Sequence, residues 1–405
     1  MAGNWPIRRL ADLCESVDYG YTTSAKDIPC GPKFLRITDI VSSGINWDSV
    51  PYCEIEDSAL PRFLLNHGDI VIARTGATTG YSAYIANPPD AVFASYLVRM
   101  KIGPEADSRF IAYFLKSSRF WDYMRGVMGD KSAQPNASAK TITQVKLKVP
   151  SLKEQKAIAH ILGTLDDKIE LNRRMNETLE GMARAIFKSW FVDFDPVHAK
   201  AEGRPTGLPP EIDALFPESF QDSELGEIPK GWYSARIDDI AMVSSGKRPS
   251  SRYEHQTDDA CIPLWGGNGP MAYVESPLFT TPVVLTGRVG TLGSVFRITS
   301  PCWPSDNTLV LQSNSEIGFE FLYLLLKRID LHSLNRGSTQ PLITQTDLKS
   351  QRFILPPLKL LRRFHQATDS IFRKIDHTNA ENYSLSGLRN LLLPKLISGE
   401  LRFTG

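Results

Sequence analysis

Four short loops of this 405-residue chain combine a cation with hydroxyl or amide side chains. Two of them directly follow apolar segments, beginning at Arg74 and at Arg288, and in both a glycine stands two residues after the arginine. Cations and hydroxyls can hold DNA phosphates, while arginine and amide side chains can form bidentate hydrogen bonds with guanine and adenine. We therefore predict a DNA-contacting surface, to which residues 36, 38 and 268 of other loops are also assigned. Its members are Arg36, Thr38, Arg74, Thr75, Gly76, Lys131, Ser132, Gln134, Asn268, Arg288, Arg336, Ser338 and Gln340.

Segments that resemble catalytic motifs lack residues that the chemistry requires. The segment Asn87-Pro88-Pro89-Asp90 is similar to the loop that holds a flipped adenine in N6 methyltransferases, but Asp90 replaces the aromatic residue that would stack on the base. A nuclease site could pair Asp90 with Glu154, although Glu154 has a structural role at the start of a helix. The sequence contains no phosphate-binding loop and no catalytic triad motif. We predict that the chain is not an enzyme and has neither catalytic nor metal-binding residues.

The chain contains an internal repeat. Residues 131–190 are similar to residues 337–396, 206 positions later and without a gap. The similarity extends more weakly through the rest of each half, and the offset changes because loops differ in length. A duplicated chain can place two similar surfaces around a pseudo-twofold axis, which suits a symmetric partner pair or a DNA duplex. Each cationic loop taken singly also fits an ordinary surface turn, but the recurrence in both halves favours a function.

Each half is predicted to be a mixed domain, which gives the fold class α+β. Apolar runs bounded by turn residues predict strands at 34–40, 69–73, 91–100 and 283–286. A buried helix is expected at 108–117 and again in the second half. The predicted target-facing domains are residues 1–150 and residues 231–355.

Two long helices are predicted after these domains, within residues 151–194 and 356–405. Ser151 and Glu154 form a capping box at the first start, and apolar residues then recur at coiled-coil spacing. A helix of about 40 residues is roughly 60 Å long, which is too long to be buried in one domain. We expect the helices to pair antiparallel, the alternative being that each packs along its own half. Polar residues in the seam are predicted to fix the register: Asn172, Asn176, Thr378 and Asn382.

Residues 195–230 are predicted to form a linker without regular structure, because proline, glycine and acidic residues are frequent there. This acidic segment affects the charge of the whole chain. The formal net charge is only +1, whereas residues 1–150 have 17 cationic and 15 acidic residues. Such weakly basic domains would need partner subunits to supply much of the attraction to DNA phosphates.

The cysteines and the apolar segments indicate the cellular environment. Five cysteines lack the spacing of zinc sites, so we predict free thiols that lie mostly in the core. The N-terminal residues do not resemble a signal peptide, and no apolar run approaches the roughly 20 residues of a membrane span. We therefore expect a cytoplasmic protein without a membrane partner.

Together these features resemble the specificity subunit of a type I restriction-modification enzyme. Each half opens near a tryptophan, Trp5 and Trp232. The first half closes with a Gln-Pro element, Pro150-Ser151-Leu152-Lys153-Glu154-Gln155 and Leu165-Asp166-Asp167-Lys168-Ile169. The second copy departs from this pattern, because Leu360-Leu361 replaces the Glu-Gln pair.

This resemblance implies two target recognition domains, each reading one half of a split double-stranded DNA target, and paired helices that set the separation. It also implies two methyltransferase (modification) subunits as partners, and restriction (translocase-endonuclease) subunits for cleavage. S-adenosylmethionine, ATP and Mg are expected only on those partners, so this chain itself should have no cofactor. The bases recognised depend on loop geometry and DNA deformation, which one sequence does not specify. Two alternatives are a self-contained methyltransferase or nuclease, and a coiled-coil scaffold without a DNA role.

Overall fold

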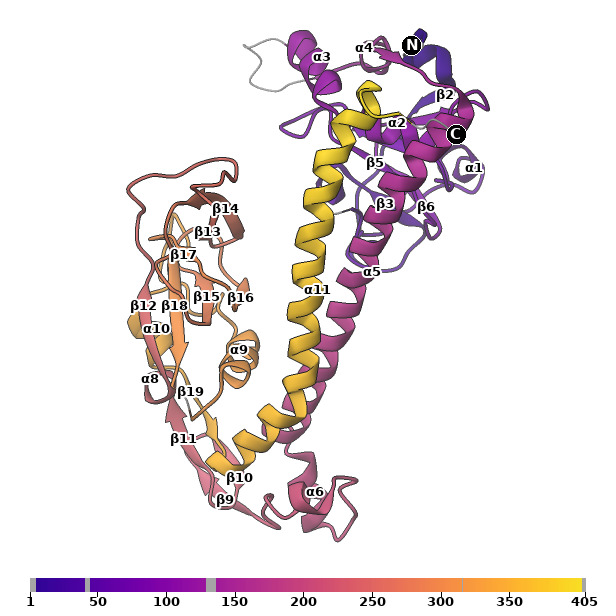
Figure 1. Cartoon of the computed structure of the whole chain (residues 1–405). Helices are drawn as coiled ribbons and strands as arrows, with labels where there is room; N and C mark the ends of the chain where they lie inside the picture. Colours follow the sequence, from indigo (N-terminus) through magenta and orange to yellow (C-terminus); the bar gives the residue numbers. More distant parts are fainter. Residues whose placement is uncertain (1–4, 41–43, 129–135, 315, 403–405) are drawn as a thin grey trace. The chain divides into compact units, whose positions relative to one another are not determined.

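The computed structural model describes residues 5–40, 44–128, 136–314 and 316–402 (Figure 1). The chain divides into two compact units, which are residues 1–171 with 381–405, and residues 172–380. Each unit combines one mixed α and β domain with parts of both long helices. The fold is therefore α+β, as the sequence predicts.

A four-stranded antiparallel sheet in the order β2-β7-β4-β5 forms the centre of the first unit. Strand β4 is apolar throughout because both of its faces are buried: Ile70 and Ile72 join the core that contains α2, whereas Val71 and Ala73 join a second core. The elements are β1 (Ile7–Arg9), η1 (Leu10–Leu13), β2 (Cys14–Tyr19), β3 (Lys33–Leu35), η2 (Ile37–Asp39), α1 (Leu60–Phe63), β4 (Ile70–Ala73), β5 (Ser82–Tyr84), β6 (Ala91–Phe93), β7 (Leu97–Ile102), α2 (Ser108–Phe114), α3 (Ser118–Met128), α4 (Ala139–Thr143) and β8 (Lys146–Lys148).

The second unit repeats this topology. Its main sheet has the order β12-β18-β15-β16, its pair β11-β19 corresponds to β1-β8, and its parallel pair β13-β17 corresponds to β3-β6. The weak similarity between the halves therefore reflects the same fold. The elements are β11 (Tyr233–Arg236), α8 (Ile237–Ile240), β12 (Ala241–Ser245), β13 (Ile262–Gly266), β14 (Gly269–Val274), β15 (Val283–Gly287), β16 (Val295–Ile298), β17 (Trp303–Pro304), β18 (Thr308–Ser313), α9 (Phe319–Arg328), α10 (Gln345–Lys349) and β19 (Arg352–Leu355).

Two of the expected strands differ from the structure, whereas those at 69–73 and 283–286 are confirmed as β4 and β15. The strand expected at 34–40 ends at Leu35, because the Asp39 carboxylate accepts the Arg36 N–H at 2.8 Å and closes a turn. The strand expected at 91–100 is divided into β6 and β7. A turn in which the Leu97 N–H donates to the Ala94 carbonyl at 2.9 Å separates the two strands.

Two long helices, α5 (Leu152–Phe191) and α11 (Leu358–Ser398), run antiparallel to each other within each unit (Figure 1). In the first unit, Arg389 of α11 donates to Asp166 of α5 at 2.9 Å. In the second unit, Asn176 of α5 donates to Asn379 of α11 at 2.8 Å. The expected helix pairing is therefore confirmed, and each domain also packs against its own part of the pair.

The start of α5 shows part of the expected capping box. The Glu154 N–H donates to the Ser151 hydroxyl at 3.3 Å, whereas the Glu154 carboxylate accepts the Trp5 indole N–H at 3.2 Å. Glu154 thus connects the N-terminal tryptophan of the domain to the first turn of the helix. The neighbouring Gln155 is buried and accepts the Asp107 N–H at 2.9 Å.

The four polar seam residues lie near the middle of the helix pair. Asn172 and Thr378 are completely buried, and the Thr378 hydroxyl donates to the Asn176 side chain. The Asn382 amide donates to the Ile169 carbonyl at 3.4 Å. Because a buried amide or hydroxyl loses its partner when the helices slide, these positions fit the predicted role in register, which stays a prediction.

The expectation of an irregular linker is wrong. Residues 195–230 contain α6 (Asp195–Ala201), α7 (Pro210–Asp213) and a hairpin of β9 (Phe220–Ser223) with β10 (Gly226–Pro229). The prolines are tolerated because those of α6 and α7 lie in the first helical turn, where no N–H is needed. Val197 and Phe216 are buried with Trp190 and Trp232, so the segment belongs to the core of the second unit.

The cysteines are free thiols, of which Cys53 and Cys302 are buried and Cys261 is exposed. The expectation of mostly buried thiols is therefore only partly confirmed. Burial raises the pKa of Cys53 to about 11 and that of Cys302 to about 12, which suppresses the reactive thiolate. We expect maleimide to label Cys261 in the native protein within minutes, and Cys53 and Cys302 only after unfolding. Peptide mass spectrometry would measure this, and equal rates for Cys302 and Cys261 would contradict the burial.

Candidate nucleic-acid interface

Arg74 stands directly after the buried strand β4 and has a fixed backbone. Its N–H donates to the Tyr96 carbonyl at 3.0 Å, and its carbonyl accepts the Ala137 N–H at 2.8 Å. Its guanidinium lies over the Tyr19 ring, with 4.8 Å from the guanidinium carbon to the ring centre. The Tyr19 hydroxyl in turn accepts the Ala139 N–H at 3.1 Å, so the ring that supports Arg74 is itself held by the start of α4.

Arg288 occupies the equivalent place after β15 in the second unit. Its N–H donates to the Asn307 carbonyl at 2.8 Å, and its carbonyl accepts the Ile343 N–H at 2.9 Å. Its Nη1 donates to the Ser245 hydroxyl at 3.4 Å, and Gln345 at the start of α10 donates to the same hydroxyl at 3.0 Å. Ser245 ends β12 as Tyr19 ends β2, so the two domains hold an arginine in the same way with different side chains.

The structure brings the arginine loops together with the segments that precede α4 and α10. Thr75 pairs with Asn136 in the first unit, and Val289 pairs with Leu342 in the second. In the first unit Lys131, Ser132 and Gln134 lie outside the described residues. Their counterparts Ser338 and Gln340 are exposed in a loop that is closed by the Arg336 N–H on the Leu342 carbonyl at 2.8 Å.

In the second unit, Asn268 also joins this loop cluster. Its side-chain amide donates to the Thr291 hydroxyl at 3.0 Å. Gly290 has a φ of +82°, and a Cβ at that position would lie 3.7 Å from the Gln340 side-chain nitrogen. Asn268, Arg288 and Gln340 are therefore neighbours, although they come from three separate parts of the sequence.

Two of the predicted DNA-contacting arginines already form ion pairs with carboxylates of the same chain. Arg36 donates to both carboxylate oxygens of Asp39, through Nε at 3.0 Å and Nη2 at 2.9 Å. Arg336 contacts Asp347 through Nε at 3.0 Å and Nη2 at 2.9 Å, and Asp347 also accepts from the Thr344 hydroxyl. The Thr344 hydrogen bond and then Arg336 hold the pKa of Asp347 below its usual range. Asp39 and Asp347 therefore compete with DNA for these two cations.

The loops that carry Thr38 and Gly76, two further predicted DNA-contacting residues of the first unit, are adjacent. Thr38 is exposed on the turn η2 after β3, and Gly76 has a φ of +80° in the loop after Arg74. A Cβ on Gly76 would lie 3.9 Å from the Ile37 side chain, so the two loops are adjacent. The glycine thus permits a backbone conformation that other residues rarely adopt.

Sequence reasoning missed the residues that support the two arginines. Tyr19 and Ser245 are the last residues of their strands, and each is followed by a glycine, Gly20 and Gly246. A Cβ on either glycine would lie 2.2 Å from a backbone carbonyl oxygen, so the chain passes very close there. An alignment of the two halves at these glycines would have indicated the pair in advance.

The motifs that resemble catalytic sites have structural explanations. Asn87 has a φ of +46° in the connection between β5 and β6, as a turn requires, and Glu154 and Gln155 are used at the start of α5. Over the described residues, no group of three or more His, Cys, Asp and Glu side chains could hold a metal ion. Within those residues, no helix is both long and apolar enough to cross a membrane.

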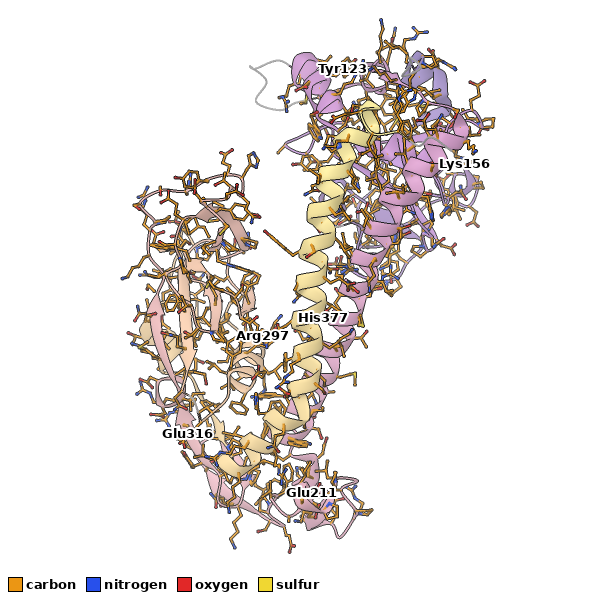
Figure 2. The ribbon with its side chains drawn as sticks, in the orientation of Figure 1. Tyr123, Lys156, Glu211, Arg297, Glu316 and His377 are labelled. Carbon is orange, nitrogen blue, oxygen red and sulfur yellow. The ribbon has the colours of Figure 1, made fainter. Side chains whose placement is uncertain are left out.

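A second charged region of the second unit joins its domain to its helices. Arg297 (labelled in Figure 2) donates to Asp376 of α11 at 2.5 Å and to Glu320 of α9 at 3.1 Å, and His365 contacts Glu320 at 3.1 Å. A cavity of about 810 Å³ is lined by these residues. Their charges are paired with one another, and none of the predicted DNA-contacting residues lines the cavity.

The fold and the loops together define a class of protein: two topologically equivalent recognition domains, each with an anchored arginine loop, attached to an antiparallel helix pair. The model of the type I restriction modification DNA specificity domain matches residues 2–181 and 229–381. This chain belongs to that family, whose role is the recognition of DNA targets, and the sequence-based assignment to type I specificity subunits is confirmed.

Relatives and solved structures agree with this assignment. The chain is 28% identical to the type I restriction enzyme HindI specificity subunit of Haemophilus influenzae, over 98% of this chain and 100% of the relative. It is 27% identical to the MjaIX specificity subunit of Methanocaldococcus jannaschii, over 98% of this chain and 94% of the relative. The S subunit structure from M. genitalium has 18% identity and a TM-score of 0.55 over 97% of this chain and 96% of that one, which supports the fold.

Proposed function

We propose that this chain gives DNA sequence specificity to a type I restriction-modification complex, with each domain reading one half of a bipartite duplex target. One observation carries the proposal: the loops that hold Arg74 and Arg288 occupy the same place in two domains of the same topology. Two such surfaces suit two separate half-sites. Different residues at equivalent positions next to the arginines, such as Tyr96 and Asn307, whose carbonyls accept from Arg74 and Arg288, would let the half-sites differ in sequence.

The helix pair is proposed to keep the half-sites at a fixed separation. The domain of the first unit packs on the beginning of α5, and the domain of the second unit packs on its end. The pair is also the proposed docking surface for two methyltransferase (modification) subunits. Exposed apolar side chains on the helices support this, since Leu171, Tyr383 and Leu391 are each about three-fifths exposed, at 60%, 60% and 59%.

Catalysis is proposed to reside on the partners. Modification subunits would bind S-adenosylmethionine and methylate the DNA, and restriction subunits would use ATP and Mg for translocation and cleavage. Two features support this division: the family match is to the specificity domain, and the chain has a net charge of only +1. A nearly neutral DNA reader needs cationic partners, because counterion release from phosphates supplies most of the non-specific affinity.

Charge reversal in the arginine loops tests the proposal. We expect Arg74→Glu to weaken specific DNA binding by the assembled complex about 10- to 100-fold, because one base or phosphate contact becomes a repulsion. Arg336→Glu should have a smaller effect, because Arg336 already pairs with Asp347. Footprinting and gel shift with the modification subunits would measure both. Unchanged footprints for both variants would exclude these loops from the interface.

Two further results would replace the proposal with an alternative. Transfer of labelled methyl groups by the purified chain alone would show a self-contained enzyme. Failure of the complex with its modification subunits to shift any duplex would favour a scaffold without a DNA role.

A further inference from the structure

We propose that Arg74 and Arg288 each read one guanine, through the two terminal nitrogens of the guanidinium, and that Tyr19 and the Ser245–Gln345 pair are positioning residues for this contact. The inference deepens the proposed function and rests on it. It assigns a base and a donor pair to each domain, and it separates these two arginines from the other cations of the loops.

The backbone of both arginines is held on both sides. In each unit the arginine N–H donates to the turn before the strand β7 or β18, and its carbonyl accepts an N–H from the segment before α4 or α10. The Cα position of Arg74, and likewise of Arg288, is therefore set by three elements of the domain. A side chain that starts from a fixed point loses less entropy on binding than one on a mobile loop.

The guanidinium groups are also supported from the protein side. The Tyr19 ring lies under Arg74, and its hydroxyl is anchored on Ala139. Ser245 accepts from Arg288 and is itself held by Gln345. Both supports connect the end of the first sheet strand to the start of the helix α4 or α10. Both units thus have an arginine at this place, supported by an aromatic ring in the first unit and by a hydroxyl in the second.

The donor atoms that remain favour an end-on contact. The Nε atoms of Arg74 and Arg288 are both buried and have no hydrogen-bond partner within the described part of the chain. The edge formed by Nε and Nη2 is therefore closed to a ligand. Arg288 Nη1 donates one of its two N–H groups to Ser245, and the other is left for an end-on contact together with Nη2. Arg36 and Arg336 differ, because they use that edge for Asp39 and Asp347.

An end-on pair of terminal nitrogens matches the O6 and N7 acceptors of guanine in the major groove. At a phosphate a lysine can replace an arginine as a point charge, whereas at a base edge it cannot reproduce the bidentate contact. Rigid support of Arg74 and Arg288 has its largest effect where the contact must select its partner, as at a base edge. Fixed geometry therefore points to a base, and guanine is the base that offers two adjacent acceptors.

The test uses the complete complex with its modification subunits. Methylation sequencing first gives the bipartite target, and each guanine is then replaced by 7-deazaguanine, which lacks the N7 acceptor. We expect one sensitive guanine in each half-site, where the replacement weakens wild-type binding about 5- to 100-fold. In the Arg74→Lys complex one of these positions should become insensitive, and in the Arg288→Lys complex the other.

The role of the positioning residues is tested separately, by discrimination at the assigned guanine and by the salt dependence of binding. Tyr19→Ala should remove discrimination at the guanine assigned to Arg74, while the salt dependence of binding stays unchanged because no phosphate contact is lost. Tyr19→Phe keeps the ring and should retain most of the discrimination. Tyr233→Ala, at a tyrosine of the second unit that is 58% exposed, is the matched control and should leave that position unaffected.

Several results would overturn the inference. A half-site without any sensitive guanine would do so with the wild-type complex alone. Additive losses from 7-deazaguanine and Arg74→Lys would assign the guanine to another residue, and full affinity of Arg74→Lys would indicate a phosphate contact. In these cases a bipartite target is still bound, so the proposed function survives. If the complex binds no duplex, the proposed function itself fails.

Discussion

Replacing Arg99 with methionine should destabilise the first unit by about 3–5 kcal/mol and leave the second unit unchanged. Arg99 lies in β7 with a side chain that is only 4% exposed. It donates to Asp18 at 3.0 Å, lies 3.9 Å from the buried Asp69, and donates to the Leu64 carbonyl at 2.9 Å. Methionine has a similar length but no charge, so it would leave a buried carboxylate without its cation.

The pKa of Asp69 predicts how this loss depends on pH. Burial raises the pKa of Asp69 above its ordinary value even with Arg99 beside it. Without Arg99 the pKa should rise further. A carboxyl whose folded-state pKa is raised contributes stability that is complete below its unfolded pKa and is lost as pH rises through its folded pKa. The deficit of Arg99→Met should therefore be larger at pH 7.5 than near pH 4.5.

Hydrogen exchange followed by peptide mass spectrometry can localise this effect. Peptides from β4 and β7 should exchange faster in the variant than in the wild-type chain at the same pH, and those from β15 and β18 should not. Equal protection of β7 in both proteins would contradict the buried-charge account. Arg125→Met is the matched control, because Arg125 forms an exposed pair with Asp122 on α3.

The second unit also provides the compensating change. By strand register, Val283 and Val310 occupy the places of Asp69 and Arg99, and both valines are completely buried. The same sheet can therefore be held without charges. Because a buried ion pair can often be replaced by apolar residues at little cost, Arg99→Met combined with Asp69→Val should recover most of the lost stability.

Periodicity along the chain was sufficient to predict the long helices and strand β4. The spacing of Ile158 and Leu162 predicts an apolar helix face, and both residues are completely buried. The antiparallel pairing also followed, because neither helix could be buried alone. Arg99 shows the limit of such reasoning. Its burial depends on Asp18 and Asp69, which are distant in the sequence, and only the sheet register brings them together.

The sequence predicts only part of the candidate interface, because some of its distinguishing contacts join residues that are far apart in the chain or form only on folding. Composition indicates which loops can contact DNA, and the internal repeat matches Arg74 with Arg288. Composition could not separate these arginines from Arg36 and Arg336, because the difference is a carboxylate that folding places on the Nε edge.

The wrong prediction for residues 195–230 has a similar cause. The frequent prolines predict no regular structure, whereas the core around Trp190 and Trp232 holds these short elements in place.

Adding one heptad to both long helices should change the spacing between the two half-sites of the target. The insertions would be placed between Leu171 and Asn172 and between Ala380 and Glu381, where the chain passes from one compact unit to the other. The antiparallel contacts on either side of these points place the added segments opposite each other. Seven residues preserve the coiled-coil seam, because two turns of a 3.5-residue repeat return to the same face.

The added length is about 10 Å, since an α-helix rises 1.5 Å per residue. At 3.4 Å per base pair this corresponds to about three base pairs, so the preferred unread spacer should lengthen by about three while both half-sites keep their sequences. Methylation sequencing of cells that express the altered system with its partners would measure the spacer. Insertion of two residues at the same points is the control, because it turns each apolar face by about 200° at 3.6 residues per turn, breaks the seam and should abolish methylation. If the heptad variant kept the original spacing, the helices would not set the distance between the half-sites, and the domains themselves or the partner subunits would have to do so.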